Sequence, residues 1–392
     1  MQRIGVEERR ARIVRRHRLA TETRASSPLE VAESLVALHS TDPATVFLST
    51  WARSLDFRPE GLEDALYEAR SLVRMLGMRR TLWVVPRALA AVVHAACTRT
   101  IAAREWKRLA GFVAQSGVTD GDPDAWLEER AAVALRAVES RGEAFTSDLS
   151  TDEPLLATKL RLGAGTRWEA QVSVASRILP LLAADGRLTR GRPRTSWTNG
   201  QYRWAPTSAW LGHELESLEP GAARAELLRR WLGSFGPATE TDIRWWAGWT
   251  AGEARAAVAA VPHATVDLVG TTGYVLADDL DPTDRPEPSA ALLPTLDPTT
   301  MGWKQRDWYL GEHASVLFDG NGNAGPTVWW DGRVVGGWAQ RKDGEVVVRL
   351  LEDVGTDAAQ AVEAEAERLV AWLGDVRVAP GFLPPFQRGL VS

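Results

Sequence analysis

The clearest chemistry in the sequence belongs to arginines in the middle of the chain. Between Arg177 and Pro206 six arginines stand against one acid, Asp185, which gives this segment a charge of +5. Arginine carries a planar fork of N–H donors that matches phosphate oxygens. The segment therefore predicts a face that binds an anionic partner such as nucleic acid, with a solvated loop of charges as the plainer alternative. The six are Arg177, Arg187, Arg190, Arg192, Arg194 and Arg203.

The net charge of the whole chain hides this pattern. The 392 residues sum to −5 because acids concentrate elsewhere: from Glu352 to Asp375 seven acids stand against one arginine. The composition excludes disordered, collagen-like and disulfide-scaffold proteins. Of the 46 basic residues only four are lysine. A GC-rich genome produces the same preference, so the arginine content by itself does not establish phosphate binding.

Several common chemistries are missing from the sequence. It contains no Walker motif, no dinucleotide fingerprint and no G-x-S-x-G elbow, and its six histidines form no close ligand pair. We therefore expect no cofactor and no metal. The single cysteine, Cys97, lies in an apolar run and is expected to be a buried, inert thiol. Without a signal segment, a membrane-length apolar stretch or heptads, the chain is expected to be a soluble, cytoplasmic monomer.

Helix signals near the N-terminus frame a short polar stretch. Ser27-Pro28-Leu29-Glu30 is a capping box with proline at the first helical position, which predicts a helix from Pro28. That helix must break before Pro43, because proline disfavours helical geometry at Asp42. A second helix is expected from Pro43 through Trp51. The stretch His39-Ser40-Thr41 lies between the two helices.

The chain repeats one order of elements, in which short helices are followed by two strands and a turn. This order is typical of a winged helix-turn-helix, and its recurrence favours a repeated unit over an unrelated small α+β domain. The best instance covers 222–280, and weaker ones cover 27–90 and 125–206. The hairpins are expected at Leu72–Leu76 with Thr81–Val85, at Leu188–Trp197 with Gln201–Trp204, and at Thr265–Val269 with Tyr274–Leu276. The expected helices include Val6–Leu19, Pro59–Arg70, Val172–Ala184, Ala222–Phe235 and those opened by Thr239 and Thr250.

An acidic, proline-rich linker over 278–288 separates these repeats from a different C-terminal part. There we expect a β-meander, with strands at Val316–Phe318, Pro326–Trp330, Arg333–Trp338 and Glu345–Leu350, closed by a helix over Ala358–Leu373. The predicted class is α+β, with three tandem winged helix-turn-helix units and a C-terminal β-rich unit. The expected divisions are 1–120 (N-terminal helices and first unit), 121–215 (second unit with the arginine-rich wing), 216–280 (third unit) and 281–392.

Five motifs follow one another along nearly the whole chain: Leu38–Pro43, Met78–Leu82, Arg190–Trp204, Leu293–Asp297 and Asp331–Trp338. Their order and spacing resemble one family, the winged-helix DNA glycosylases of the AlkZ/YcaQ type. Leu38-His39-Ser40-Thr41-Asp42-Pro43, followed by Leu48 to Arg53, is similar to the family's catalytic helix region. Met78-Arg79-Arg80-Thr81-Leu82 is similar to its M-R-G-T-L strand, and Arg190 through Trp204 to its second wing. The C-terminal signature is matched by Leu293-Pro294-Thr295-Leu296-Asp297 and by Asp331-Gly332-Arg333-Val334-Val335-Gly336-Gly337-Trp338.

The resemblance implies a C-shaped protein with a positively lined cleft that hydrolyses the N-glycosidic bond of alkylated purines. Its partner would be double-stranded DNA of the nucleoid carrying N7- or N3-alkylated, bulky or crosslinked purines. The DNA-binding residues it implies in this sequence are Arg79, Arg80, Arg190, Arg192, Arg194 and Arg203.

The sequence departs from the family at the catalytic motif, where His39-Ser40-Thr41 replaces Gln-x-Gln or Gln-x-Asp. As catalytic candidates, His39 would orient or deprotonate a water and Thr41 would hold that water. Neither copies the reach or charge of Gln or Asp. The alternative reading is structural: Thr41 or Asp42 caps the next helix, and His39 is a satisfied histidine at a helix end.

Three functions therefore stay open. The first is a DNA glycosylase. The second is a catalytically inactive or altered winged-helix DNA-binding protein, either a lesion sensor or a transcription regulator. The third is a fold in which the repeats only scaffold the C-terminal β unit.

Overall fold

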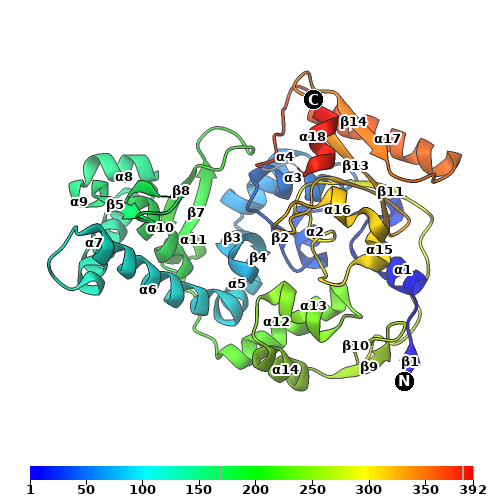
Figure 1. Cartoon of the computed structure of the whole chain (residues 1–392), viewed down its shortest axis with the longest axis horizontal. Helices are drawn as coiled ribbons and strands as arrows, with labels where there is room; N and C mark the ends of the chain where they lie inside the picture. Colours follow the sequence, from blue (N-terminus) through cyan, green and yellow to red (C-terminus); the bar gives the residue numbers. More distant parts are fainter. Residues whose placement is uncertain (168, 382–383, 392) are drawn as a thin grey trace.

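A computed structural model describes residues 1–167, 169–381 and 384–391. Two large hydrophobic cores organise it: one joins residues 13–97 with 205–378, and the other lies within 109–204. Figure 1 shows the second core as a separate lobe built from α6 to α10 and β5 to β8, in teal and green. The smallest core, Ile4 with Val266, Leu268 and Val275, fixes the N-terminal strand to a distant hairpin.

The first repeat begins as the capping signals predict. The Ser27 hydroxyl accepts from the Glu30 amide at the start of α2 (Pro28–Ser34). The Asp42 carboxylate accepts from the Ala44 amide at the start of α3 (Pro43–Trp51). The remaining elements are the strand β2 (Leu38–His39), the helix α4 (Pro59–Glu63), the π-helical turn η2 (Asp64–Glu68), β3 (Leu72–Leu76), the turn η3 (Met78–Arg80) and β4 (Leu82–Pro86).

A run of three short helical segments and then one long helix connects the first repeat to the second. These are the short segments η4 (Arg87–Leu89), α5 (Ala90–Val93) and η5 (His94–Thr98), and the long α6 (Arg99–Ser116). The repeat itself contains α7 (Pro123–Arg141), α8 (Thr146–Asp152), α9 (Pro154–Ala157), the hairpin β5 (Lys159–Leu162) and β6 (Ala170–Ser173), α10 (Ala175–Ala184), β7 (Leu188–Pro193), β8 (Tyr202–Pro206) and α11 (Thr207–Leu211).

The third repeat carries two capping boxes, Thr239 with Asp242 and Thr250 with Glu253. Each reciprocal pair satisfies backbone donors at a helix start, which explains why both starts are readable from sequence. The elements are α12 (Pro220–Phe235), α13 (Glu240–Ala247), α14 (Ala251–Ala260), β9 (His263–Asp267) and β10 (Thr272–Leu276), with β1 (Gln2–Arg3) parallel to β9.

The same pairing recurs in all three repeats. A residue between the first two helices pairs with the second strand of the hairpin: β2 pairs with β4, Ala144 with Trp204, and Ala238 with Tyr274. Each hairpin is thereby tied to the helices that precede it in sequence. This tie matters for the site, because β2 carries His39 and is fixed by two residues of β4.

The C-terminal part is a four-stranded antiparallel sheet in the order β11–β12–β13–β14, with α17 packed against it. The strands are β11 (Ala290–Leu293), β12 (Thr327–Trp330), β13 (Arg333–Gln340) and β14 (Val346–Leu350). The helices are α15 (Asp307–Leu310), η6 (Gly311–His313), α16 (Ala314–Leu317), α17 (Thr356–Leu373) and α18 (Pro385–Val391), and the N-terminal α1 (Val6–Arg16) and η1 (Thr21–Thr23) complete the fold.

The mixed α+β class is confirmed, and several details of the prediction are wrong, among them the strand predicted to Trp197, which ends at Pro193, and the hairpin β5–β6, which was not predicted. The strand expected at Val316–Phe318 is the end of α16, and only Phe318 makes a β-bridge, to Ala324. The helix expected from Val172 begins at Ala175, because 170–173 pairs with β5. The edge strand β11 was not predicted, since Ala290–Leu293 is a short apolar run without alternation.

Candidate active site and nucleic-acid interface

Helix α3 is held in place by a buried ion pair. Arg53, just beyond its C-terminus, and Asp297 both have side chains that are 0% exposed, and they meet at 2.7 Å. All five guanidinium N–H groups are used, on Asp297, Thr299 and the carbonyls of His17 and Ser49. Asp297 also accepts from the Ser49 hydroxyl at 2.6 Å. This network joins α3 to the segment after β11, within the motif Leu293–Asp297.

The motif His39-Ser40-Thr41 presents its three side chains to different surroundings. His39 is 2% exposed, and its ring packs edge-on against Trp83 at 4.7 Å. Burial and then the nearby charge of Arg79 lower the pKa of His39 to about 3. Ser40 is buried and accepts from the Arg74 Nε at 2.8 Å. Thr41 is the exposed member, and its hydroxyl accepts from the Leu82 amide at 3.3 Å.

His39 and Thr41 touch through one hydrogen bond: the Thr41 amide donates to Nδ1 of His39 at 3.4 Å. A neutral imidazole with so low a pKa is a weak proton acceptor at neutral pH. The geometry brings the two predicted residues together, and it leaves only Thr41 in contact with open space.

A cavity of about 370 Å³ opens beside Thr41 and Asp42. It is closed by two segments that are remote in sequence, the loop between β7 and β8 and the chain after α17. Trp197 of that loop stacks on Phe47 of α3 at 4.9 Å and lies 5.7 Å from Trp372 of α17. The loop of the second repeat therefore lies over the motif of the first. The lining residues are Thr41, Asp42, Pro43, Ala44, Thr198, Gly200, Leu296, Ala379 and Gly381.

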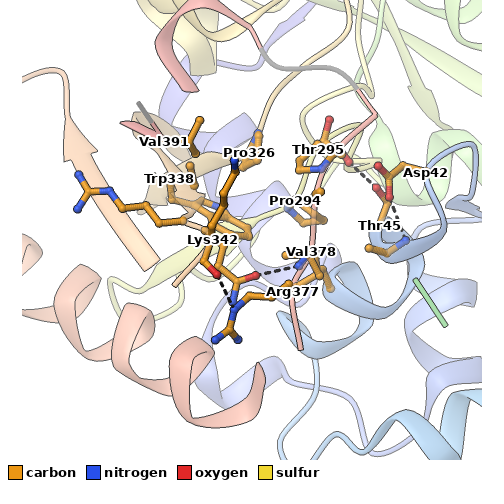
Figure 2. Close-up of a pocket in the computed structure, with 17 residues that line it drawn as sticks. Asp42, Thr45, Pro294, Thr295, Pro326, Trp338, Lys342, Arg377, Val378 and Val391 are labelled. Carbon is orange, nitrogen blue, oxygen red and sulfur yellow. Dashed lines mark hydrogen bonds between the residues drawn. The ribbon is translucent and has the colours of Figure 1, made fainter. Parts of the chain in front are cut away.

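A second cavity, of about 230 Å³, adjoins the first through Asp42, Ala44 and Ala379. Figure 2 shows Asp42 and Thr45 at one end and Trp338 and Val391 toward the other. Its walls are mostly apolar, and cationic side chains of Lys342 and Arg377 lie along one side. Asp42 is the one residue with a charged side chain that lines both cavities.

The predicted wing arginines do not form one free cationic strip. Arg192 pairs with Glu63 at 3.4 Å and with Glu68 at 2.7 Å, both in the first repeat. These acids lie more than a hundred residues away in sequence, so the local charge count missed them. Arg192 thereby links the second repeat to the first.

Three further wing arginines pack on aromatic rings. The guanidinium of Arg190 lies 4.6 Å from the Trp204 ring, and burial lowers its pKa to about 10. Arg194 lies 4.0 Å from the Phe145 ring and donates to the Ser147 hydroxyl at 2.8 Å. Arg203 is exposed and lies 3.7 Å from Glu143. Arg203 also lies 5.2 Å from the Phe145 ring, and Arg194 lies 3.8 Å from Asp148, so each of these two exposed arginines has one acid nearby.

Arg79 and Arg80, from the predicted M-R-G-T-L-like strand, lie in the turn η3. Arg79 has a left-handed backbone (φ 53°) and stacks over Trp245 at 4.0 Å. Arg306 approaches the same ring at 5.2 Å, and burial together with Arg306 lowers the pKa of Arg79 to about 10. Arg79 Nε and Arg306 Nη1 are buried without a hydrogen-bond partner in the described structure.

Arg80 lines a third cavity of about 350 Å³ between the first and second repeats. Arg190 lines it too, so this cavity brings together two of the predicted DNA-binding residues. Its other cationic residues are Arg108 and Arg177, and Glu105 is the one acid among the lining residues. A groove with this balance of charge suits phosphate oxygens.

Sequence reasoning did not assign Arg306, Trp197 or Asp297 a role at the site. Asp297 had a weak signal, as the last residue of a motif already singled out. Arg306 and Trp197 had none, because their partners Trp245 and Phe47 are distant in sequence.

Cys97 is buried, and burial raises the pKa of its thiol to about 12. Within the described ranges, no group of three or more His, Cys, Asp or Glu side chains is arranged to hold a metal ion. No helix in the same ranges has the length and apolar character that crossing a bilayer requires.

Comparison with known proteins bears on this arrangement directly. The family model for "DNA glycosylase AlkZ-like" matches residues 32–372. A curated relative, an "Interstrand DNA cross-link repair glycosylase" from Streptomyces sahachiroi, is 28% identical over 282 residues, 67% of this chain and 70% of that protein. The solved structure of Streptomyces sahachiroi DNA glycosylase AlkZ superposes with a TM-score of 0.74 at 23% identity, over 96% of this chain and 99% of that one, which shows the common fold. The chain belongs to the AlkZ-like DNA glycosylase family.

Proposed function

We propose that this protein hydrolyses the N-glycosidic bond of alkylated purines in double-stranded DNA, including N7- and N3-alkylated, bulky or crosslinked bases. The observation that carries the proposal is the cavity beside Thr41 and Asp42, at the position of the family's catalytic motif. A cationic alkylpurine is already a good leaving group. The site therefore has to place a water and stabilise the positive charge that develops on the sugar, and it does not have to supply an acid.

We assign different roles to the two predicted catalytic residues. Thr41 faces the cavity, so its hydroxyl is suited to hold the attacking water. His39 is buried and accepts a hydrogen bond from the Thr41 amide, so its role is to position Thr41. His39 and Thr41 also support the alternative of an activity that differs from that of the family, because neither side chain has the amide or carboxylate of the family's catalytic motif.

For the fold, we propose that the three repeats are winged helix-turn-helix units arranged in a C around the DNA. The recurring tie between an inter-helix residue and the second hairpin strand supports this reading. The proposed divisions are 1–120, 121–215, 216–280 and 281–392, and the separate core within 109–204 supports the second of these as a unit. We propose a monomer that acts on nucleoid DNA.

For the DNA contact, we propose that Arg79, Arg80, Arg190, Arg192, Arg194 and Arg203 line the binding face. The groove with Arg80 and Arg190 supports a phosphate contact, and Arg108 and Arg177 join the set there. Arg192 would exchange two acids, at 3.4 and 2.7 Å, for phosphate, whereas Arg194 and Arg203 would each exchange one acid at 3.8 and 3.7 Å. We therefore expect Arg192 to contribute less than Arg194 or Arg203.

The test is single-turnover base release from duplexes carrying N7-methylguanine or a larger N7-alkylguanine. We expect release by the wild type and a loss of about tenfold in Thr41→Ala, the worth of about one hydrogen bond to the water. DNA affinity, measured in parallel, stays unchanged in that variant. Tight binding by the wild type without release from any adduct would refute the enzyme and favour the lesion sensor or regulator.

A further inference from the structure

The cavity at the motif contains a single charged side chain. Of the residues that line it, only Asp42 is ionisable; the others are threonines, glycines, alanines, a proline and a leucine. Hydrolysis of an N-glycosidic bond develops positive charge on the sugar, and a carboxylate stabilises that charge better than a hydroxyl does. Thr41 is neutral, and His39 does not line the cavity.

Asp42 keeps capacity to bind a substrate or water. Its Oδ1 accepts from the Ala44 amide at 2.9 Å, and its Oδ2 accepts from the Gly381 amide at 3.2 Å. The Thr45 amide is a third backbone donor to this carboxylate. The two carboxylate oxygens offer four lone pairs between them, so one lone pair remains available after these three hydrogen bonds. Three backbone donors hold the carboxylate in a fixed orientation where the two cavities meet.

Capping of α3 does not by itself explain a carboxylate at this position. The hydroxyls of Ser27, Thr239 and Thr250 cap other helices of the same chain. Asp122 offers a direct comparison: it also precedes a proline and accepts from the second amide of its helix, at 3.3 Å, but it is exposed and lines none of the cavities described above. Asp42 differs by facing a cavity.

We propose that Asp42 is the catalytic carboxylate of the glycosylase, displaced by one residue from the family's motif position. This inference rests on the proposed function. The Asp42 carboxylate faces the anomeric carbon, stabilises the oxocarbenium ion and accepts a proton from the attacking water held by Thr41. The water oxygen bonds to C1′, the C1′–N bond breaks, its electron pair leaves with the now neutral purine, and the proton passes from Asp42 to solvent.

The electrostatics around Asp42 are compatible with an anion that must remain reactive. Within the described residues no cationic group lies within 4.0 Å of its carboxylate. The charged and titratable groups that face it from packed elements are Tyr202 of β8 and, around the second cavity, Arg341, Lys342 and Arg377. Burial raises the pKa of Asp42 above its ordinary value, and the amides of Gly381, Ala44 and Thr45 oppose that rise.

The experiment compares Asp42→Asn and Asp42→Ser with Asp122→Asn in single-turnover base release from N7-methylguanine duplexes. Both Asp42 variants retain a capping oxygen, as Ser27 does in α2. We expect a loss of roughly 10²-fold or more in both, in the range of lost proton transfer by a positioned group. Duplex affinity and thermal unfolding stay near wild type, and Asp122→Asn keeps wild-type activity.

The pH profile separates chemistry from a structural effect. In the wild type the rate, corrected for release without enzyme, rises with pH as Asp42 ionises, and this acidic limb is absent from Asp42→Asn. Release by Asp42→Asn within threefold of wild type, or an unchanged acidic limb in it, would overturn the assignment to Asp42 while the proposed function stands. If the wild type releases no base, both the proposed function and this assignment fall.

Discussion

The buried pair Arg53–Asp297 makes a quantitative prediction about what holds the site together. Asp297 accepts four hydrogen bonds, from two guanidinium nitrogens of Arg53, the Ser49 hydroxyl and the Thr299 amide. Asp297→Ala removes all four and leaves the Arg53 charge buried without its anion. Removal of one partner from a buried pair costs about 3–5 kcal/mol. We expect the free energy of unfolding to fall by that amount.

A surface pair provides the matched control. Arg141 and Asp152 meet at 2.9 Å with side chains that are 32% and 50% exposed. Exposed pairs contribute about 0–1 kcal/mol, because solvent screens them and ordering two side chains costs entropy. Asp152→Ala should therefore lower the free energy of unfolding by about 1 kcal/mol at most.

The measurement is urea denaturation followed by tryptophan fluorescence and far-UV circular dichroism. The chain has 18 tryptophans, several of them fully buried, so fluorescence reports the global loss of packed structure. A loss in Asp297→Ala that matches the loss in Asp152→Ala would refute the argument. It would mean that the remaining hydrogen bonds from Arg53 to Thr299, Ser49 and His17 are enough to compensate the buried charge.

Three further outcomes follow from the same structure. Arg194→Ala and Arg203→Ala should each lower the slope of log K for duplex binding against log salt concentration by about one. The control Arg229→Ala, on α12, should leave this slope unchanged. Equal slopes in all three variants would show that the wing arginines do not contact DNA phosphates. Because burial lowers the pKa of His39 to about 3, the unfolded chain binds its proton first, and stability falls with falling pH between about 6.5 and 3. Urea titrations at pH 4 to 6 give the free energy of unfolding as a function of pH, and His39→Asn should make this dependence shallower by about 1.4 kcal/mol per pH unit. An unchanged pH dependence in that variant would contradict the burial of a neutral ring. Because burial raises the pKa of Cys97 to about 12, a thiol reagent should label it only in urea, and rapid labelling of the native protein would show that this core opens readily.

Local signals in the sequence account for much of the secondary structure. The sequence predicts the helix starts at Ser27, Asp42, Thr239 and Thr250, because each of these side chains accepts from a backbone amide at most three residues further along the chain. The strand predicted at Val316–Phe318 is wrong because no such local signal marks this segment. A short apolar run reads equally as strand or helix, and its packing partners decide which it becomes.

The candidate site was predicted only in part. The sequence indicated His39 and Thr41 through a family resemblance, but it gave no reason to separate them. The structure separates them by burial: the ring of His39 lies against Trp83, and Thr41 faces the cavity. The wing arginines show the same limit, because the acids that pair with Arg192 come from another repeat.

By itself, the sequence determined the class of fold, the helix caps and the local concentration of arginine, because these depend on residues that are close together in the chain. The order of the motifs along the chain determined the family. Only the tertiary structure decided which groups share a cavity and which charges are already paired. Thr41 and Asp42 meet Thr198 and Gly381 across more than 150 residues of chain. Burial and charge pairing depend on the distances between side chains in the folded protein, and a local pattern of residues does not determine those distances.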